Sequence, residues 1–200
     1  EQNAVGSGTS FHGTGGIGLP EHYVNPPELG ELVWTGSLIQ MRVTPEIAEE
    51  SGVNVFYLKR DRAMTVAATE EAWANLQVVN RARVKFLTEI SDTDWGEARL
   101  ISADEAYKLE PCLGKEIQIF GGEYRTGLIS GAWVDPYRLT LAYAQLAEKH
   151  GVEVLNRTVV GLVKDGSRVT GVLTSEGEQI LCENVVLAMG NWTPVAEEWL

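Results

Sequence analysis

The pattern that most constrains this chain lies in its last third, where one helix leads into a series of strands. Asp135 and Pro136 begin a helical pattern that ends at Gly151, because aspartate caps a helix, proline suits its first position and glycine its end. The stretch VEVL (152–155) predicts a strand, and TVVGLVKD with RVTGVLTS predicts a hairpin around Gly166. A helix that leads into strands is typical of α/β or α+β architecture.

The segment after the hairpin predicts one further strand and then the interior of a sheet. The sequence EQILCEN is followed by the apolar run VVLAM at 185–189, which has no polar alternation and ends at Gly190. Strands that are buried on both faces of a parallel sheet have such continuous apolar runs. We therefore expect 185–189 to form a buried parallel strand, with the antiparallel hairpin inserted before it.

The N-terminal quarter predicts a loop followed by at least one helix. Residues 1–30 are rich in Gly, Ser, Thr and Pro and predict a loop with one short helical turn, whereas 31–43 fit either a strand or a helix. Thr44 as N-cap and Pro45 in the first helical position predict a short separate helix over 44–52.

The middle of the chain contains three segments with strand patterns. VNVFYLKR (53–60) alternates apolar and polar residues, and we expect it to pair with MTVAA (64–68). IQIF (117–120) predicts another strand, which the glycines Gly121 and Gly122 are expected to interrupt. Periodicity identifies these segments as strands, and proximity in the sequence is the basis for pairing the first two.

Two helices are predicted between these strands. Thr69 is placed to cap a long helix that runs through about Glu89, with apolar residues at helical spacing. Ser102 and Glu105 form a capping-box pattern for a short helix that Pro111 ends.

Composition limits the class of partner and compartment. The chain has 200 residues, 44% of them hydrophobic, with a formal net charge of −12 and a pI near 4.7. That charge argues against a nucleic-acid partner, which needs a basic patch, and offers no basic anchor for an anionic membrane. Cys112 and Cys182 lack metal-ligand spacing, so we expect no metal site, and two lone thiols fit a reducing, cytoplasmic compartment. No apolar run approaches the roughly 20 residues of a membrane span.

One glycine motif resembles a nucleotide-binding fingerprint in letters alone. Gly13-Thr-Gly15-Gly-Ile-Gly18 fits G-x-G-x-x-G. That fingerprint requires a strand before it and a helix after it, because the pyrophosphate binds at the helix N-terminus. Here GSGTSFH precedes the glycines and LPEHYVNPPELG follows them, so neither context fits. We interpret the run as a glycine loop, either simply flexible or one whose backbone passes close to a flat ligand.

Three other segments carry a more specific pattern when they are taken together. They are Glu1-Gln2-Asn3 with SGTSFHGTGG (7–16), GAWVDPYRLTLAYAQLAEKHGVEVLNRTVVGLV (131–163) and VVLAMGNW (185–192). In order and spacing they resemble the D-amino-acid oxidase family of FAD-dependent oxidoreductases, and within it the dimethylglycine and sarcosine dehydrogenases. The resemblance covers most of the chain and is loose only over 20–100.

The resemblance implies a fold and a division into domains. We expect an FAD/NAD(P)-binding Rossmann-like domain, incomplete in this chain, with an inserted antiparallel portion of a substrate domain. Residues 1–30 and 131–200 would belong to the FAD-binding domain, and 31–130 to the substrate or cap domain. The chain would be an internal fragment that begins inside its nucleotide-binding unit at Glu1. A strand, a true G-x-G-x-x-G turn and a helix are expected within about 35 residues before Glu1, the size of a βαβ unit.

The resemblance also implies a set of FAD-binding residues. Glu1 would accept hydrogen bonds from the adenosine ribose hydroxyls, and Val159 would contact the adenine. Small polar residues make anion-binding turns, and a glycine at the end of a strand allows a ligand to approach the backbone. The other expected residues lie near the phosphates (Ser7, Gly8, Thr9 and Ser10) or along the flavin nucleotide (Ala188, Gly190 and Trp192).

His12 carries the sharpest functional hypothesis. In family members with an aromatic–His pair, that histidine holds the flavin covalently through a ring nitrogen. This chain has Phe11–His12 where Trp–His is more usual, so three roles stay open: covalent attachment, noncovalent contact with the flavin, and no role. His22 and His150 lack such a context and are interpreted as surface residues.

The implied reaction is the oxidation of a C–N bond in a small amino acid or N-methylated amine, similar to sarcosine or dimethylglycine, with oxygen or an electron-transfer protein as acceptor. The alternatives are a family neighbour acting on D-amino acids or glycerol 3-phosphate, and a non-catalytic flavin-fold interaction protein. Family members usually hold a substrate carboxylate with Arg, Lys or Tyr. Arg125, Tyr124 and Arg42 are candidates, although no motif singles one out. The catalytic residues are expected to follow Leu200.

Overall fold

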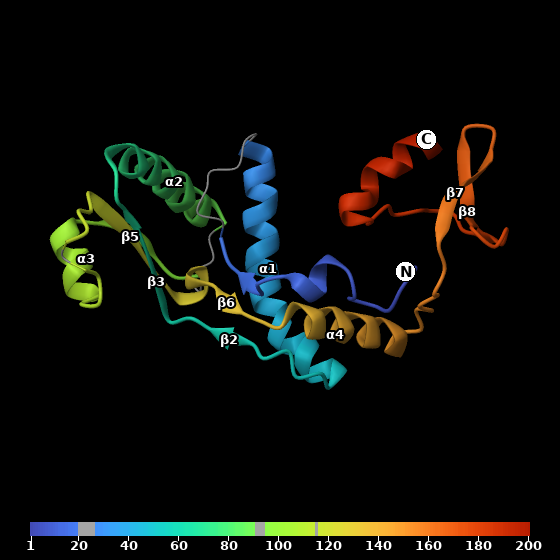
Figure 1. Cartoon of the computed structure of the whole chain (residues 1–200), viewed down its shortest axis with the longest axis horizontal. Helices are drawn as coiled ribbons and strands as arrows, with labels where there is room; N and C mark the ends of the chain where they lie inside the picture. Colours follow the sequence, from blue (N-terminus) through green and yellow to red (C-terminus); the bar gives the residue numbers. More distant parts are fainter. Residues whose placement is uncertain (20–26, 91–94, 115) are drawn as a thin grey trace.

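The computed structural model describes residues 1–19, 27–90, 95–114 and 116–200. Its helices and strands form three groups along the longest axis of the molecule (Figure 1). Each group contains a three-stranded sheet, and every strand pair among the described residues is antiparallel. The chain is therefore a mixed α/β structure with the α+β elements that the sequence predicts.

The first group, at the left of Figure 1, is a sheet in the order β3-β5-β4 packed with two helices. Its elements are β3 (Arg62–Ala67), α2 (Glu70–Glu89), β4 (Ala98–Ile101), α3 (Ala103–Leu109) and β5 (Gly121–Thr126). Both predicted helix caps are confirmed. The Thr69 hydroxyl accepts from Ala72 N at 3.1 Å. The Ser102 hydroxyl accepts from Glu105 N at 3.2 Å, which satisfies a backbone donor that the helix leaves unpaired.

Strand β5 corrects the prediction for its region. The sequence predicts a strand over 117–120 and a break at the two glycines, but the strand begins at Gly121. A Cβ at Gly121 would lie 2.8 Å from the ring of Trp73, and one at Gly122 would lie 2.8 Å from the carbonyl oxygen of Thr65. The glycines therefore belong to the strand because α2 and β3 pack directly against its bare backbone.

The second group, in the middle of Figure 1, joins two long helices to a small sheet in the order β1-β6-β2. Its elements are η1 (Thr9–His12), β1 (Gly16–Ile17), α1 (Pro27–Ser51), β2 (Leu58–Lys59), η3 (Gly127–Ser130), β6 (Ala132–Trp133) and α4 (Pro136–Lys149). The predicted start of α4 is confirmed, since Asp135 Oδ1 accepts from Arg138 N at 3.0 Å. Only the end of 53–60 forms a strand, and its partner is β6 instead of 64–68. Alternation identifies a strand but does not specify its partner.

The helix predicted over 44–52 is the end of the longer helix α1, which also includes the segment that fitted either a strand or a helix. Pro45 lies inside α1 and lacks the N–H that would bond to the carbonyl four residues earlier. That carbonyl belongs to Met41 and instead accepts a hydrogen bond from the Tyr57 hydroxyl at 3.0 Å. Thr44 is not a cap; it is fully buried, and its hydroxyl donates to a backbone carbonyl one turn earlier at 2.6 Å. A tertiary contact thus lets the helix continue through proline.

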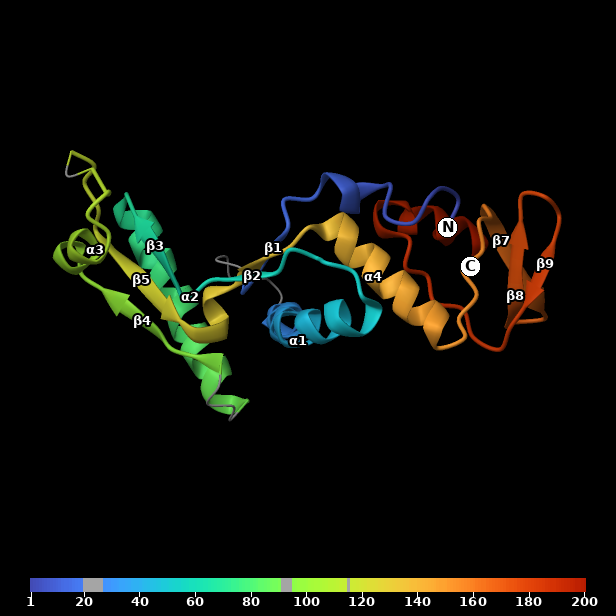
Figure 2. The same ribbon diagram turned by 90° about the horizontal axis from the view of Figure 1, so that it is seen from below.

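The third group, at the right of Figures 1 and 2, is the sheet β7-β8-β9 with a 3₁₀ helix nearby. Its elements are β7 (Val159–Asp165), β8 (Arg168–Thr174), β9 (Gln179–Leu181) and η4 (Gly190–Trp199). The predicted hairpin around Gly166 is confirmed, with Asp165 opposite Arg168. Strand β9 confirms the strand predicted within EQILCEN.

Two further strands predicted in this region are not formed. The run 185–189 lies outside any strand, and Val186 is 88% exposed. VEVL (152–155) is also not a strand, but Glu1 N donates to the Leu155 carbonyl at 3.3 Å and Arg157 N donates to the Glu1 carbonyl at 2.9 Å. Glu1 is therefore bonded to the two residues on either side of Asn156, which is the hydrogen-bond pattern between parallel strands. The apolar run 185–189 has no such pairing: none of the described strands is hydrogen-bonded to it.

The main core lies between the first two groups. Tryptophan, aliphatic and phenylalanine side chains from α1 and α2 fill it, together with residues that flank the sheets: Leu19, Trp34, Leu38, Met41, Phe86, Trp95 and Ile129. A smaller cluster of Ile47, Val55 and Ala142 joins α1 to α4. The main core thus includes Ile17 of the small sheet, and the smaller cluster packs α4 against α1.

Candidate functional site

The loop over 6–13 lies on the first turn of α4 (Figure 2). Gly6 has φ of +76°, and a Cβ there would lie 2.9 Å from the ring of Tyr137. A Cβ at Gly13 would lie 3.4 Å from Pro136. The loop therefore approaches α4 closely at both ends, and Gly6 needs both a left-handed conformation and the absence of a side chain.

Aromatic contacts connect this loop to the helix. Phe11 meets the Tyr137 ring edge-on with centroids 5.4 Å apart, and it meets His12 in the same manner at 5.2 Å. Edge-to-face packing of this kind adds about 0.5–1.5 kcal/mol to a contact. His12 is exposed at the end of η1. The imidazole is thus presented to solvent from a loop that Tyr137 holds in place.

The small polar residues expected near the phosphates lie on this same loop. Ser7 N donates to the Ala4 carbonyl at 3.0 Å, and Gly8 is the residue before η1. Nothing lies within 4 Å of a Cβ built on Gly8. Ser7, Thr9 and Ser10 are exposed. Hydroxyls on an accessible turn, beside an imidazole, suit a ligand with both a diphosphate and a flat ring.

The other expected FAD-binding residues lie in the third group or next to it. Glu1 is bonded through its backbone beside Asn156, shortly before Val159 begins β7. Ala188 is exposed and Gly190 has φ of +56°, with open space where a side chain would be. Trp192 in η4 is 67% exposed. The backbone bonds of Glu1 thus place it near the start of β7. None of the hydrogen bonds described joins Glu1 to Ala188, Gly190 or Trp192.

The glycine run at 13–18 packs against protein and does not begin a helix. Its second half is strand β1. Gly15 has φ of +78°, and a Cβ there would lie 2.0 Å from the Val134 carbonyl oxygen, while Val134 N donates to the Gly15 carbonyl at 2.9 Å. This agrees with the interpretation that the run is not a phosphate-binding fingerprint. The residues 20–26, including His22, lie outside the described part.

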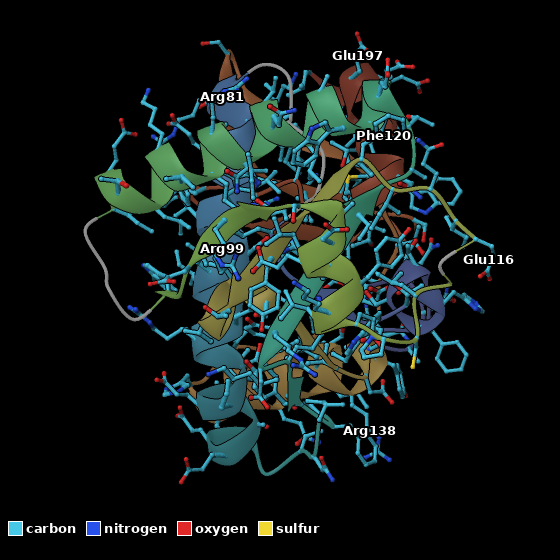
Figure 3. All side chains as sticks on the ribbon, turned by 90° about the vertical axis from the view of Figure 1, so that its left-hand side faces the viewer. Arg81, Arg99, Glu116, Phe120, Arg138 and Glu197 are labelled. Carbon is cyan, nitrogen blue, oxygen red and sulfur yellow. The ribbon has the colours of Figure 1, made fainter. Side chains whose placement is uncertain are left out.

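The candidate carboxylate-binding residues have partners within the chain. The Arg42 guanidinium lies 4.2 Å from the ring centroid of Trp95. The second candidate, Tyr124, contacts Arg99, which is labelled in Figure 3: the guanidinium lies 5.4 Å from the centroid of the tyrosine ring. An Arg99 nitrogen also lies 2.6 Å from a Glu105 oxygen. The hydrogen bond with Glu105 raises the pKa of Arg99 and lowers the pKa of the Glu105 carboxyl.

The third candidate, Arg125, belongs to a buried polar network that the sequence did not reveal. Glu123 is fully buried, and its carboxylate accepts from Asn80 Nδ2 at 2.9 Å and from Arg83 Nη1. Arg125 Nε lies 3.7 Å from the same carboxylate, and Arg125 Nη2 donates to the Thr65 hydroxyl at 3.1 Å. Three-residue spacing puts the two α2 residues on one helix face, but their carboxylate partner is some 40 positions away. The network fastens α2 to the sheet.

Four further features bear on the class of site. The described residues contain no cluster of three or more His, Cys, Asp or Glu suited to a metal ion. Cys112 and Cys182 are exposed and are not joined in a disulfide. In the part of the chain that the structure describes, none of the helices combines the length and apolarity of a membrane span. His150 is exposed, as expected, with Nε2 3.0 Å from a Glu50 oxygen.

Comparison with known proteins identifies the family. The family model described as FAD dependent oxidoreductase matches residues 1–199, so this chain belongs to that family. The hydrogen cyanide synthase subunit HcnC of Pseudomonas aeruginosa is 22% identical over 177 residues, which cover 88% of this chain and 39% of that protein. The 4-methylaminobutanoate oxidase (formaldehyde-forming) of Paenarthrobacter nicotinovorans is 26% identical over 96% of this chain and 21% of its own length.

The fold agrees with this assignment. The crystal structure of glycine oxidase from Bacillus cereus matches with a TM-score of 0.67 at 24% identity, over 100% of this chain and 50% of that one. The chain thus spans about half the length of its structural neighbour, and less of the two relatives above. The family implies FAD as cofactor. The exposed hydroxyls and imidazole of the loop over 6–13 are compatible with it.

Proposed function

We propose that this chain forms part of an FAD-dependent oxidoreductase that oxidises the C–N bond of a small amino acid or an N-methylated amine. The observation that carries the proposal is the loop over 6–13, seated on α4 with His12 exposed, in a chain of the FAD dependent oxidoreductase family. Relatives named as a methylaminobutanoate oxidase and a glycine oxidase support an amine or amino-acid substrate. A sarcosine-like or dimethylglycine-like substrate is the specific form of the proposal.

The cofactor would be held by residues of the N-terminal segment and of the third group. In this proposal Ser7, Gly8, Thr9 and Ser10 bind phosphate, and Glu1 accepts from ribose hydroxyls. Val159 contacts the adenine, while the flavin nucleotide lies along Ala188, Gly190 and Trp192. A bound flavin supplies the acceptor for a hydride equivalent from the C–H beside the amine nitrogen, and the protein supplies orientation and electrostatics. Residues 1–30 and 131–200 would form the FAD-binding part, and 31–130 the substrate side.

His12 is proposed as the attachment point if the flavin is covalent. The His12 ring nitrogen would form one bond to the 8-methyl carbon of the flavin, and that methyl group would lose one proton. The two electrons of the broken C–H bond would reduce the flavin, and molecular oxygen or a protein acceptor would then take them up. A neutral imidazole has the lone pair that this bond requires. The exposure of His12 and its edge-on contact with Phe11 support access to the ring nitrogen.

The test uses the protein expressed from its complete reading frame. We expect a yellow sample whose flavin absorbance is lost when N-methylglycine or N,N-dimethylglycine is added without oxygen. Acid precipitation should leave flavin on the wild-type protein and release it from His12→Ala, whose fold is checked by circular dichroism. A well-folded protein without flavin would contradict the proposed function. Flavin that acid releases from the wild type would contradict covalent attachment alone.

A further inference from the structure

Three aromatic rings form a continuous contact from helix α4 to the N-terminal loop. Tyr137 is the second residue of α4, and its ring meets Phe11 with an interplanar angle of 76°. Phe11 in turn meets His12 at 83°. Both contacts are edge-to-face, the arrangement that the quadrupoles of aromatic rings favour. Figure 2 shows η1, which contains Phe11 and His12, beside the start of α4. The imidazole is therefore connected to a regular helix through the ring of Phe11.

The Phe11 side chain does not belong to a core. It is 57% exposed, and none of the residues of η1 is buried. The helix η1 also lacks a side-chain cap, and so short a 3₁₀ helix has few hydrogen bonds of its own. Burial thus explains little of the placement of Phe11. What the ring does in this structure is to contact the aromatic side chains on either side of it.

His12 and His150 are both exposed, but their rings have different partners. Nε2 of His150 lies 3.0 Å from a carboxylate oxygen of Glu50. Among the residues that the structure describes, the nitrogens of His12 take part in no hydrogen bond or ion pair, and its ring contacts Phe11 instead. A carboxylate would engage a ring nitrogen and favour the protonated imidazole, which has no lone pair. An aromatic neighbour can orient the imidazole and leave both nitrogens accessible.

The contact with Phe11 is strong enough to select one orientation of an exposed imidazole. A side chain in solvent distributes among the three staggered χ1 rotamers. An edge-to-face contact favours one of them by about 2- to 12-fold over the same side chain without the contact. Reacting atoms must be aligned before a bond can form, so this preference should appear in the rate of a reaction at the imidazole nitrogen.

We propose that Phe11 is a positioning residue for the covalent attachment of the flavin to His12. This inference rests on the proposed function and deepens it: the Phe11 ring, held by Tyr137, keeps the imidazole in the rotamer that reacts. One ring nitrogen of His12 becomes bonded to the 8-methyl carbon, and the imidazole and the methyl group each lose one proton. Molecular oxygen finally takes up the two electrons of the broken C–H bond together with two protons, and becomes hydrogen peroxide.

The test measures attachment separately from binding. Flavin-free protein, produced from the complete reading frame under riboflavin limitation, would be mixed with FAD in air, and acid-stable flavin fluorescence would be followed with time. Phe11→Ala should slow attachment about 2- to 12-fold, while the Kd for FAD stays within about twofold. Phe11→Trp keeps an aromatic ring and should restore most of the rate. Phe11→Leu keeps apolar bulk without a ring; it should be as slow as Phe11→Ala and replaces that variant if it does not fold.

A spectroscopic measurement follows the imidazole in the absence of flavin. In flavin-free protein with isotope-labelled histidine, Phe11→Ala should move the ring-proton NMR shifts of His12 toward those of free histidine, because the neighbouring ring current is lost. The shifts of His150 are the internal reference and should not move. Tyr143→Ala is the matched control, since this other tyrosine of α4 donates to Gln40 Oε1 at 3.0 Å and lies outside the three-ring contact. It should change neither the rate of attachment nor the His12 shifts.

Several results would overturn the inference. They are an unchanged rate or unmoved His12 shifts in Phe11→Ala, a slower rate matched by an equally weaker Kd for FAD, and a Phe11→Trp variant as slow as Phe11→Ala. Flavin that acid releases completely from the wild type would also overturn it, and would leave the proposed oxidation of an amine standing. A folded wild type that binds no flavin would instead contradict the proposed function, and this inference with it.

Discussion

The first and third groups of this chain differ in how completely their side chains are buried and paired within the described chain. In the first group Glu123 and Arg83 are fully buried and hydrogen-bonded to each other, and Val79 on α2 is fully buried. In the third group Val186 is 88% exposed although it lies in the apolar run 185–189, and Trp192 is 67% exposed. Apolar patterning produces a core only where a partner element is present to cover it. The first group has its partners within the described chain, and the apolar run of the third group does not.

The largest effect is expected from breaking the buried network of the first group. Glu123→Ala removes the acceptor for Asn80 and Arg83 and leaves a buried cation without that carboxylate. We expect a loss of about 3–5 kcal/mol in unfolding free energy, measured by urea denaturation. Glu97→Ala, on an edge of the same group, is the control and should change stability by less than about 0.5 kcal/mol. A loss below about 1 kcal/mol in Glu123→Ala would show that the network is not structural.

A matched pair of valines tests the contrast directly. Val79→Ala should lower the free energy of unfolding in urea by about 2 kcal/mol, because the side chain is fully buried. Val186→Ala should cost less than about 0.5 kcal/mol in this chain, because the same side chain is largely in water. Equal losses would mean that 185–189 is covered by another part of the protein in solution, and the comparison between the groups would fail.

The packing of the loop over 6–13 against α4 should depend on the aromatic ring at position 137. Tyr137→Ala removes the ring that Phe11 and Gly6 contact, and we expect a loss of about 1–2 kcal/mol with faster amide exchange over 6–12. Tyr137→Phe retains the ring and should exchange like the wild type. In the full-length protein the first variant should also retain less flavin after dialysis. Unchanged exchange in Tyr137→Ala would rule out this role.

A smaller effect is expected where α1 passes through proline. Tyr57→Phe removes the donor to the Met41 carbonyl and should cost about 1 kcal/mol. Burial raises the pKa of the Tyr57 hydroxyl, so the folded state favours the protonated form. This contribution is fully present below the unfolded pKa of about 10 and is lost as pH rises through the raised folded pKa. Stability curves of the two proteins should therefore converge at alkaline pH; parallel curves would contradict the hydrogen bond.

Much of the local structure could be predicted because its causes lie within a few residues. Thr69, Ser102 and Asp135 each cap the helix that follows them, and Gly166 lies in the predicted hairpin turn. The resemblance in the loop and in α4 agrees with the family that the comparison identifies. The binding roles of the individual residues, from Glu1 to Trp192, remain predictions that the flavin experiments test.

Only the tertiary structure decided features whose causes are distant in sequence. Pro45 stays inside α1 because Tyr57 bonds to the carbonyl that proline leaves open, and Gly121 begins a strand because Trp73 occupies the space beside it. Arg60 lies over Gly131 only because β2 pairs with β6. Caps, turns and helical periodicity act over one or two turns of chain, so the sequence by itself determined them. Strand partners, buried ion pairs and the position of Arg60 depend on which segments meet, and only the packed structure specifies that.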